Sequence, residues 1–205
     1  SKTTIGWLLT GTATSLRPIS SNKTLIYNGQ ESLDSMVLTN SSNKSKWLIY
    51  SGNMNLRHRF DGEGKELSVD IERSGFRRNN NQLYINQTAD PSGNLIGIAD
   101  TLTGQFPSIM GVTSIKSDLS IPLKDKMKIE TGFKSSWINN DNDVLFYNQK
   151  GHGPVLNTNL SNHFIYNENI NALYVTYSKE KDKLNYQVGL RGEQTKTKGK
   201  QITTG

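Results

Sequence analysis

The stretch NENINALYVTYSKEKDKLNYQVGLRGEQTKTKG, from Asn167 to Gly199, decides the fold class. From Leu184 to Leu190 every other residue is apolar, and the residues between them are polar or glycine. This period of two indicates a strand with one apolar and one polar face. The preceding arm runs from Ile170 to Lys179, and only Glu180–Lys183 separates the two arms. The stretch therefore predicts a tight hairpin with a solvated turn and unusually long arms.

The same alternation recurs along the chain and predicts further arms. Apolar residues on one face and polar residues on the other mark the arms Lys46 to Phe60, Leu67 to Ile71 and Met127 to Trp137. Two further strand candidates are Thr3 to Thr14 and Ile109 to Ile121. Short turns centre near residues 62, 124 and 182, about 60 residues apart. We predict an all-β fold, an antiparallel up-and-down meander of about six long strands.

Long polar stretches separate these pairs of arms, and we predict them to be loops: Leu16 to Asn43, Gly75 to Pro107 and Asn139 to Asn167. In the first of them, Leu25–Tyr27 and Met36–Leu38 are expected to form a small hairpin. In the second, Asp90–Asn94 is a turn signal between Gln82–Gln87 and Leu95–Ile98.

The composition limits the class of protein. The chain has 205 residues, of which 33% are hydrophobic, and it has 18 Gly and no Cys. Disulfides and cysteine-based metal sites are therefore excluded. No apolar run approaches the length of a membrane-spanning helix, but a membrane barrel, whose strands alternate, is not excluded. We find no signal peptide, and because a strand is already under way at Thr3 we expect the chain to be an excised piece of a longer protein.

The net charge of +6 raises nucleic acid or an anionic surface as a partner. The turns at Lys124–Lys126 and Glu180–Lys183 mix both signs, which is typical of solvated corners and disfavours nucleic acid. Only Lys196, Lys198 and Lys200 form a run of one sign.

The connections alternate in length, and this favours one architecture. Short turns on one side, long polar connections on the other and arms of alternating polarity are the plan of an outer-membrane barrel. The arms also exceed the roughly 9–11 residues that a tilted strand needs to cross a bilayer.

Two segments carry a family resemblance. SNHFIYNENINA (Ser161–Ala172) and GLRGEQTKTKG (Gly189–Gly199) resemble the outer-membrane β-barrel family of TonB-dependent receptors. Leu56–Asp61 and Gly132–Ser136 sit where that family has similar phrases. The resemblance covers most of Lys46–Gly205, is strongest after Ile121 and is weak before Asn43.

The resemblance implies that residues 1–205 are a single segment of a larger barrel domain of about 22 strands, without its plug domain. Such receptors take up bulky nutrients, siderophore- or glycan-like, across the outer membrane with energy relayed by TonB. Six arms cannot enclose a lumen, so we expect a structural wall segment with no activity of its own, no cofactor and no catalytic residue. The expected partners are membrane lipid and the rest of the barrel, with TonB contacted through regions absent from this chain. We expect no nucleic-acid partner, and we expect the isolated chain to self-associate through its two sheet edges.

The candidate site residues have simpler explanations. His58, His152 and His163 show no spacing typical of a metal site, and His163 is interpreted as structural. Asn139–Asp143 lacks the Gly and Glu of a calcium loop, and Gly151–Pro154 lacks the features of a phosphate loop. Glu66, Asp70 and Glu72 alternate on a polar strand face, which a lumen-facing or solvated face explains better than acid–base chemistry.

Six aromatic residues allow two interpretations. These residues are Trp7, Trp47, Trp137, Tyr50, Tyr174 and Tyr177. In a barrel they form interfacial girdles, which the alternation of turns favours. In the rival hypothesis, a soluble carbohydrate- or protein-binding β-sandwich, they form a core or a stacking platform. A third hypothesis, an enzyme on a β-scaffold, has only scattered polar residues in its favour.

Overall fold

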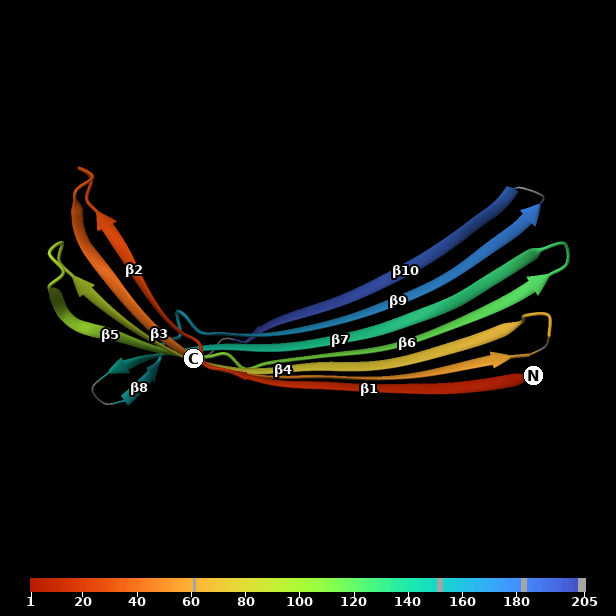
Figure 1. The fold of residues 1–205 in the computed structure, drawn as a ribbon, viewed down its shortest axis with the longest axis horizontal. Coiled ribbons are helices and arrows are strands. Elements are labelled where there is room, and N and C mark those ends of the chain that lie inside the picture. The colour runs from red at the N-terminus through yellow and green to blue at the C-terminus, as the bar shows by residue number, and fades with distance from the viewer. Residues whose placement is uncertain (61, 151–152, 182–183, 203–205) are drawn as a thin grey trace.

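The computed structural model describes residues 1–60, 62–150, 153–181 and 184–202, and these form one antiparallel sheet of ten strands (Figure 1). The strands are β1 (Lys2–Leu16), β2 (Ile19–Tyr27), β3 (Leu33–Arg59), β4 (Glu66–Ala89), β5 (Leu95–Gln105), β6 (Ser108–Leu123), β7 (Met127–Lys150), β8 (Gly153–Leu156), β9 (Asn162–Lys181) and β10 (Leu184–Ile202). The predicted all-β antiparallel meander is confirmed. The part of the chain that the structure describes holds no helix long and apolar enough to cross a membrane.

The ten strands make up a seven-stranded meander. β1 and β2 both pair with β3, and β5 and β6 both lie between β4 and β7. The two members of each pair are separated by a proline, Pro18 or Pro107, which has no N–H to donate to the ladder. The carbonyl groups of these prolines still accept hydrogen bonds from the backbone N–H groups of Asn43 and Asp143, each at 3.0 Å. Among the described residues, seven strands have 15 residues or more, compared with the six or so long strands predicted.

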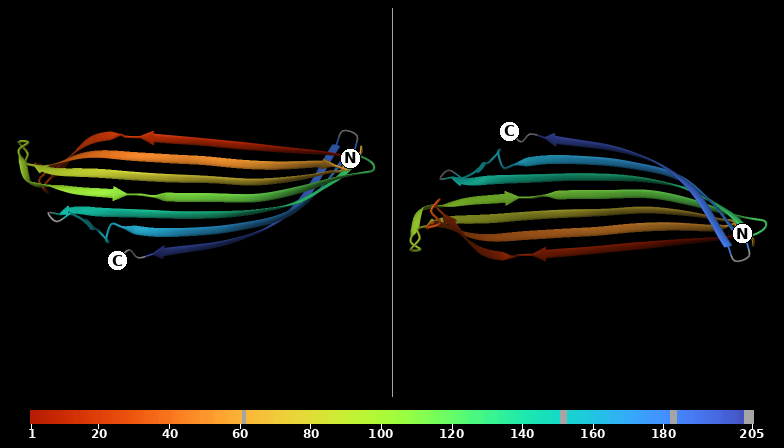
Figure 2. Two further views of the ribbon diagram at one scale, coloured as in Figure 1. Left: turned by 90° about the horizontal axis from the view of Figure 1, so that it is seen from below. Right: turned by 90° about the horizontal axis from the view of Figure 1, so that it is seen from above.

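The sheet is an open trough with two free margins. Figure 2 shows the long strands side by side across its width, with β1 at one margin and β10 at the other. No pairing joins β1 to β10 among the residues that the structure describes. The sheet bends where the prolines interrupt it, and β2 and β5 turn away from the long strands there (Figure 1).

The prediction of long polar loops is wrong. Residues of all three predicted loops continue the strands as paired extensions, so that β3 has 27 residues and β7 has 24. Asn139–Val144, for example, pairs with β9 from Asn162 to Asn167. Backbone pairing satisfies the N–H and C=O groups whatever the side chains are, so polar residues on both faces do not end a strand that is outside an apolar environment. At about 3.3 Å per residue β3 spans about 90 Å, far more than a bilayer's apolar core of roughly 30 Å.

The smaller hairpins inside the predicted loops are confirmed. Leu25 pairs with Met36, and Thr88 and Ala89 pair with Ile96 and Leu95. The first turn is closed by hydrogen bonds that Asn28 makes with the Gln30 and Ser32 backbone. Of the predicted short turns, residues 61, 182 and 183 lie outside the described part of the chain.

Very little of this sheet forms a core. Among the described residues the buried apolar side chains are Met36, Ala89 and Ala172 only. The fold is therefore held by its backbone ladders and cross-strand pairs, and most of its apolar surface points away from the protein.

Candidate functional site

The register divides the long strands into two faces of different chemistry. Residues directly opposite each other share a face, and the side chains alternate along each strand. One such row joins Phe133 of β7, Leu173 of β9 and Gly192 of β10. The row one residue away joins Lys134, Ala172 and Glu193 on the other face. We call the first face, which contains Leu173, the outer face, and the second the inner face.

The outer face carries an exposed apolar band near the end where β3 meets β4. Every long strand contributes apolar residues to this band. They include Ile5, Trp7, Leu9, Met54, Leu56, Val69, Ile71, Ile115, Leu119, Ile129, Phe133, Leu173, Val175, Tyr177, Leu184, Tyr186, Val188 and Leu190. The exposed fraction reaches 70% at Leu173 and 76% at Leu190. Apolar side chains on this scale need an apolar environment to cover them, because exposed patches of this size mark interaction or membrane surfaces.

The inner face carries charges of both signs, arranged in pairs. The Nε atoms of Arg57 and Arg59 lie 3.1 and 2.9 Å from the two carboxylate oxygens of Glu66. Lys116 pairs with Asp118 at 2.6 Å. Lys128–Glu130 and Arg191–Glu193 repeat the arrangement on β7 and β10. These ion pairs are partly exposed, so each contributes at most about 1 kcal/mol to stability.

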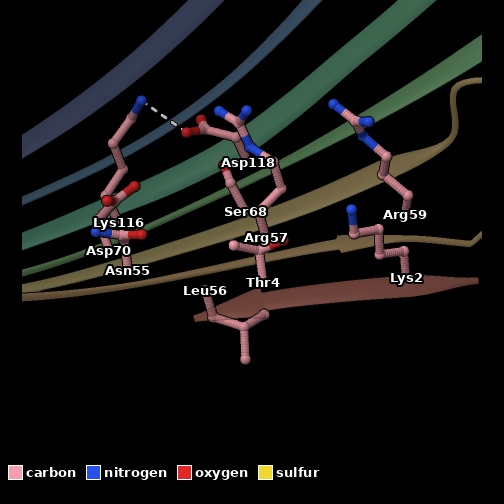
Figure 3. Close-up of a pocket in the computed structure, with 10 residues that line it drawn as sticks. All are labelled: Lys2, Thr4, Asn55, Leu56, Arg57, Arg59, Ser68, Asp70, Lys116 and Asp118. Atoms are coloured by element: carbon pink, nitrogen blue, oxygen red, sulfur yellow. Dashed lines mark ion pairs between the residues drawn. The ribbon is translucent and has the colours of Figure 1, made fainter. Parts of the chain in front are cut away.

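A hollow of about 690 Å³ lies on the inner face between β1, β3, β4 and β6. Lys2, Arg59, Asp70, Lys116 and Asp118 are among the residues that line it. Figure 3 shows their polar groups on one side of the sheet. The side chain of Leu56 points to the opposite side, toward the apolar band. The hollow offers charged and hydroxyl groups for binding, but the arrangement contains no nucleophile–base pair that would indicate catalysis.

Glycines on both faces make room for large side chains of the neighbouring strand. A β-carbon at Gly75 would overlap the ring of Tyr50 on the outer face. A β-carbon at Gly132 would lie 2.6 Å from the Tyr174 hydroxyl and 2.7 Å from Asp118 Oδ1 on the inner face. These contacts fix the register of β4 against β3 and of β7 against its neighbours, because a shift by one residue would bring a side chain into the same space.

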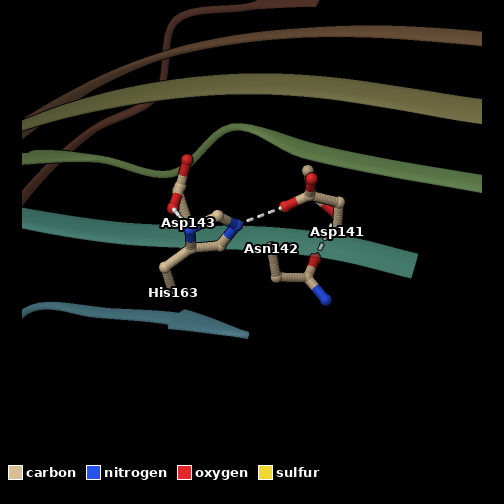
Figure 4. Close-up of polar contacts among 5 residues, drawn as sticks. Asp141, Asn142, Asp143 and His163 are labelled. Atoms are coloured by element: carbon tan, nitrogen blue, oxygen red, sulfur yellow. Dashed lines mark hydrogen bonds and ion pairs between the residues drawn. The ribbon is translucent and has the colours of Figure 1, made fainter. Parts of the chain in front are cut away.

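The two histidines that the structure describes contact side chains on neighbouring strands. His163 Nε2 lies 2.8 Å from Asp141 Oδ1, and His163 Nδ1 lies 3.4 Å from Asp143 Oδ1, all on adjacent strands (Figure 4). His58 Nδ1 lies 2.7 Å from the Thr3 hydroxyl across the β1–β3 pair. Within residues 1–60, 62–150, 153–181 and 184–202, no group of three or more His, Asp or Glu side chains has metal-binding geometry. His152 and Gly151 lie outside the described residues.

The other candidates are also placed by the sheet. Asn139–Asp143 belongs to β7 and forms no loop. Glu66, Asp70 and Glu72 share the inner face of β4, as a lumen-facing row would. Of the six aromatic residues singled out, Trp7, Tyr50, Trp137 and Tyr177 lie on the outer face, and Trp47 and Tyr174 lie on the inner face. Four of the six thus lie on the outer face, the face that an interfacial girdle would occupy, and two do not.

The sequence did not predict that the residues of the inner-face hollow lie together. The sequence does not distinguish Lys2, which precedes the first predicted arm, or Lys116 and Asp118, which are two polar residues among several in Ile109 to Ile121. The alternation gives the face of each residue. Only the register between four strands shows which of these residues meet.

These features define a class of protein. A single sheet with an exposed apolar band on its outer face and paired charges on its inner face is the wall of a membrane-spanning β-barrel, in which strands alternate between lipid and lumen. The family model described as outer membrane protein beta-barrel family matches residues 58–205, and the chain belongs to this family. The protein is therefore located in the outer membrane. No individual curated protein gives a match to the chain.

Proposed function

We propose that this chain is part of the barrel wall of a TonB-dependent outer-membrane receptor that takes up bulky nutrients, siderophore- or glycan-like. Membership of the outer-membrane barrel family supports the coarse class. The segments Ser161–Ala172 and Gly189–Gly199, which form much of β9 and β10, support the finer class through their resemblance to such receptors.

The observation that carries the proposal is the open curvature of the sheet. Seven long strands in an eight-stranded barrel would almost close on themselves, but here β1 and β10 lie at opposite margins of a trough (Figure 2). A wall with this shallow curvature fits a barrel of many more strands, and 22-stranded transporters are the large class with a plugged lumen. The paired charges on the inner face support the same class, because a folded plug needs a polar wall to contact.

The orientation follows from the asymmetry of the strands. The apolar band begins at the end with the turns near residues 62 and 124, and the strands extend far beyond the band at the other end. Bacterial barrels have short connections on the periplasmic side and long ones outside the cell. The β3–β4 and β6–β7 turns are therefore proposed to be periplasmic.

The wall segment has no activity of its own in this proposal, since uptake belongs to the whole barrel. The soluble β-sandwich is not what the structure shows, because the described strands form one sheet rather than two packed sheets.

The test uses the full-length protein in its own membrane and in a planar bilayer. Uptake of ⁵⁵Fe-loaded hydroxamate siderophore and of fluorescent maltodextrin is measured in wild-type and deletion strains, with and without a protonophore. We expect deletion to abolish protonophore-sensitive uptake of one of these probes, and the purified protein to show no steady conductance. Stable open-channel conductance together with protonophore-insensitive uptake would identify a porin and contradict the proposal.

A second proposal concerns the isolated 205-residue chain. β1 and β10 each pair on one side only among the described residues, so both margins present free N–H and C=O groups. We propose that isolated chains associate through these edges. Size-exclusion chromatography with light scattering should show oligomers, and a strictly monomeric chain with rapidly exchanging edge amides would count against it.

A further inference from the structure

The outer face carries a basic patch that begins at the edge of the apolar band, where Arg73 shares a row with Leu9, and extends beyond it. The patch consists of Lys44 and Lys46 on β3 and Arg73 and Arg77 on β4. All four side chains are exposed. Arg77 lies opposite Leu48, so Lys46 is its diagonal neighbour on the same face.

The cations of the basic patch differ from those of the inner face. On the inner face five Lys and Arg residues form ion pairs with carboxylates within the sheet. None of the four patch residues forms an ion pair with any residue that the structure describes. Arg73 donates a hydrogen bond to the hydroxyl group of Thr113, which is uncharged and does not neutralise the guanidinium. The four cations are therefore exposed and take part in no ion pair among the described residues.

The nearest carboxylate on the outer face is Asp141 of β7, which lies two strands from Arg77 in the register and lines a hollow with Arg73. Its Oδ1 lies 2.8 Å from His163 Nε2, and it forms no ion pair with the patch. β1 contains no Asp or Glu at all. In β6 the single acidic residue is Asp118, which lies on the inner face and pairs with Lys116. Within the described sheet the basic patch therefore has no carboxylate in ion-pair contact, and an external anion can bind to it.

A second hollow adjoins the basic patch and adds uncharged polar groups. It has a volume of about 670 Å³ and is lined by Lys44, by Arg17 of the β1–β2 connection, and by amide and hydroxyl side chains of β4, β5 and β7 that include Asn81, Gln105, Tyr147 and Gln149. Amide and phenol groups around a cation are suited to a ligand that combines sugar hydroxyls with an anionic group.

The depth of the basic patch matches the edge of a bilayer. Lys46 is ten residues from Leu56 along β3, which at about 3.3 Å per residue and a strand tilt of roughly 45° corresponds to about 23 Å of depth. The apolar band of an outer-membrane barrel is about 25 Å tall. Lys46 thus lies where the lipid headgroups begin, and Arg77, opposite Leu48, lies next to it.

We propose that the basic patch, with the adjoining hollow, is a docking surface for the phosphorylated sugar headgroups of outer-leaflet lipids. The cations bind the phosphates, and the amides of the hollow bind the sugars. The patch faces the outer leaflet because of the orientation proposed above, and the inference does not depend on whether the barrel is a TonB-dependent receptor.

The test measures how much lipid A the purified full-length protein binds in detergent, by native mass spectrometry and by titration. The variant is Lys46→Gln with Arg77→Gln. The matched control is Lys128→Gln with Lys134→Gln, which removes the same charge from the inner face. Each cation near an anionic lipid surface contributes a factor of about five to binding, so we expect the patch variant to bind lipid A roughly 30-fold more weakly and the control to bind within twofold of wild type.

Three results would overturn the proposal: equal binding by the patch variant and wild type, an equal loss in the control variant, or wild-type protein that binds phosphatidylcholine as well as lipid A. Dephosphorylated lipid A should bind as weakly to wild type as lipid A binds to the patch variant. Inorganic phosphate is also titrated against the protein, alone and in the presence of lipid A. If it displaces lipid A at the concentration at which it binds on its own, the patch is a site for a free anion and the lipid assignment is wrong. Heat-modifiable gel mobility, measured for every variant, confirms that each one is folded, and a patch variant that fails to fold is replaced by Lys44→Gln alone with its own fivefold expectation.

Discussion

The apolar band makes a direct prediction for Val175, which lies near its middle on β9. Its side chain is 44% exposed, and it pairs with Leu190 of β10 and Thr131 of β7. Tyr177 and Leu173 flank it on the same face. In the proposed barrel this position faces the hydrocarbon of the membrane, where no group can solvate a charge.

The perturbation is Val175→Arg. An arginine on the lipid face of a barrel costs about 2–4 kcal/mol near the bilayer midplane and less toward the interfaces. Val175 has apolar residues on both sides along the strand, so we expect a loss of this size, which is roughly a 30- to 700-fold change in the folding equilibrium. The side chain cannot escape easily to water, since the nearest charged outer-face position on β9 is Lys179, two pleats away.

The control is Thr176→Arg, one residue along the chain. Thr176 lies on the inner face, opposite Glu130 of β7. An arginine there meets a carboxylate and a hydrated lumen, so its cost should stay within about 0.5 kcal/mol.

The assay is guanidinium unfolding of the full-length protein in phosphatidylcholine vesicles, followed by tryptophan fluorescence. A lower midpoint for Val175→Arg and an unchanged midpoint for Thr176→Arg are expected. Equal midpoints for the two variants, or a larger loss for Thr176→Arg, would show that the assignment of the two faces is reversed or that the sheet does not border lipid.

Three further predictions concern contacts within the sheet. Gly75→Ala should destabilise the protein by about 1–3 kcal/mol because its β-carbon overlaps the ring of Tyr50, and Tyr50→Ala in the same chain should recover part of that loss in a double-mutant cycle of unfolding free energies. Asp90 accepts hydrogen bonds from the side chain and the backbone N–H of Asn94, at 2.9 and 2.8 Å, which lower the pKa of its carboxyl group below the usual 3.8. The ionised carboxyl group therefore stabilises the turn at pH values above its usual pKa. This stabilisation is lost as the pH falls through the lowered pKa of the folded protein. Carboxyl ¹³C NMR should show the low pKa and its rise in Asn94→Ala. Glu66→Gln removes the carboxylate that two arginines share, and because the pairs are partly exposed the loss should be under about 1 kcal/mol and should shrink at high salt; a larger loss that is independent of salt would mean that the ion pairs are not solvated.

Much of the sheet could be predicted from local pattern. The alternation from Leu184 to Leu190 gives both the strand and its apolar face, and β10 pairs with β9 as the short turn requires, with Val188 opposite Tyr177. The hairpins at Leu25 and Asp90 were also found, because Asn-Gly and Asp-Pro-Ser-Gly-Asn sequences specify turns locally.

The extent of the strands could not be predicted in the same way. Asn139–Val144 has no apolar face, so its alternation carries no signal, yet its backbone pairs with β9. Hydrophobic periodicity reports where one face of a strand meets an apolar environment. Outside that environment only the pairing partner decides whether a segment is a strand, and the partner is not visible in the segment itself.

The candidate site shows the same limit. The alternation places Arg57 and Asp70 on polar faces, but the inner-face hollow needs the register of four strands, and the basic patch needs the register of two. Gly75 and Tyr50 help to set that register through a contact 25 positions apart in sequence. Such a contact is recognised only when both strands are seen side by side.

The meander topology also indicates how the number of strands in such a wall can change. Each long strand pairs with its neighbours along the chain, and no connection crosses another or threads the sheet. With three buried apolar side chains in the described residues, no central core ties distant hairpins to one another. A hairpin can therefore be duplicated or lost as a unit while the ladders within the remaining hairpins keep their register, with only one new seam to form. The spacing of about 60 residues between successive short turns is then the length of the module by which a barrel of this kind grows or shrinks during evolution.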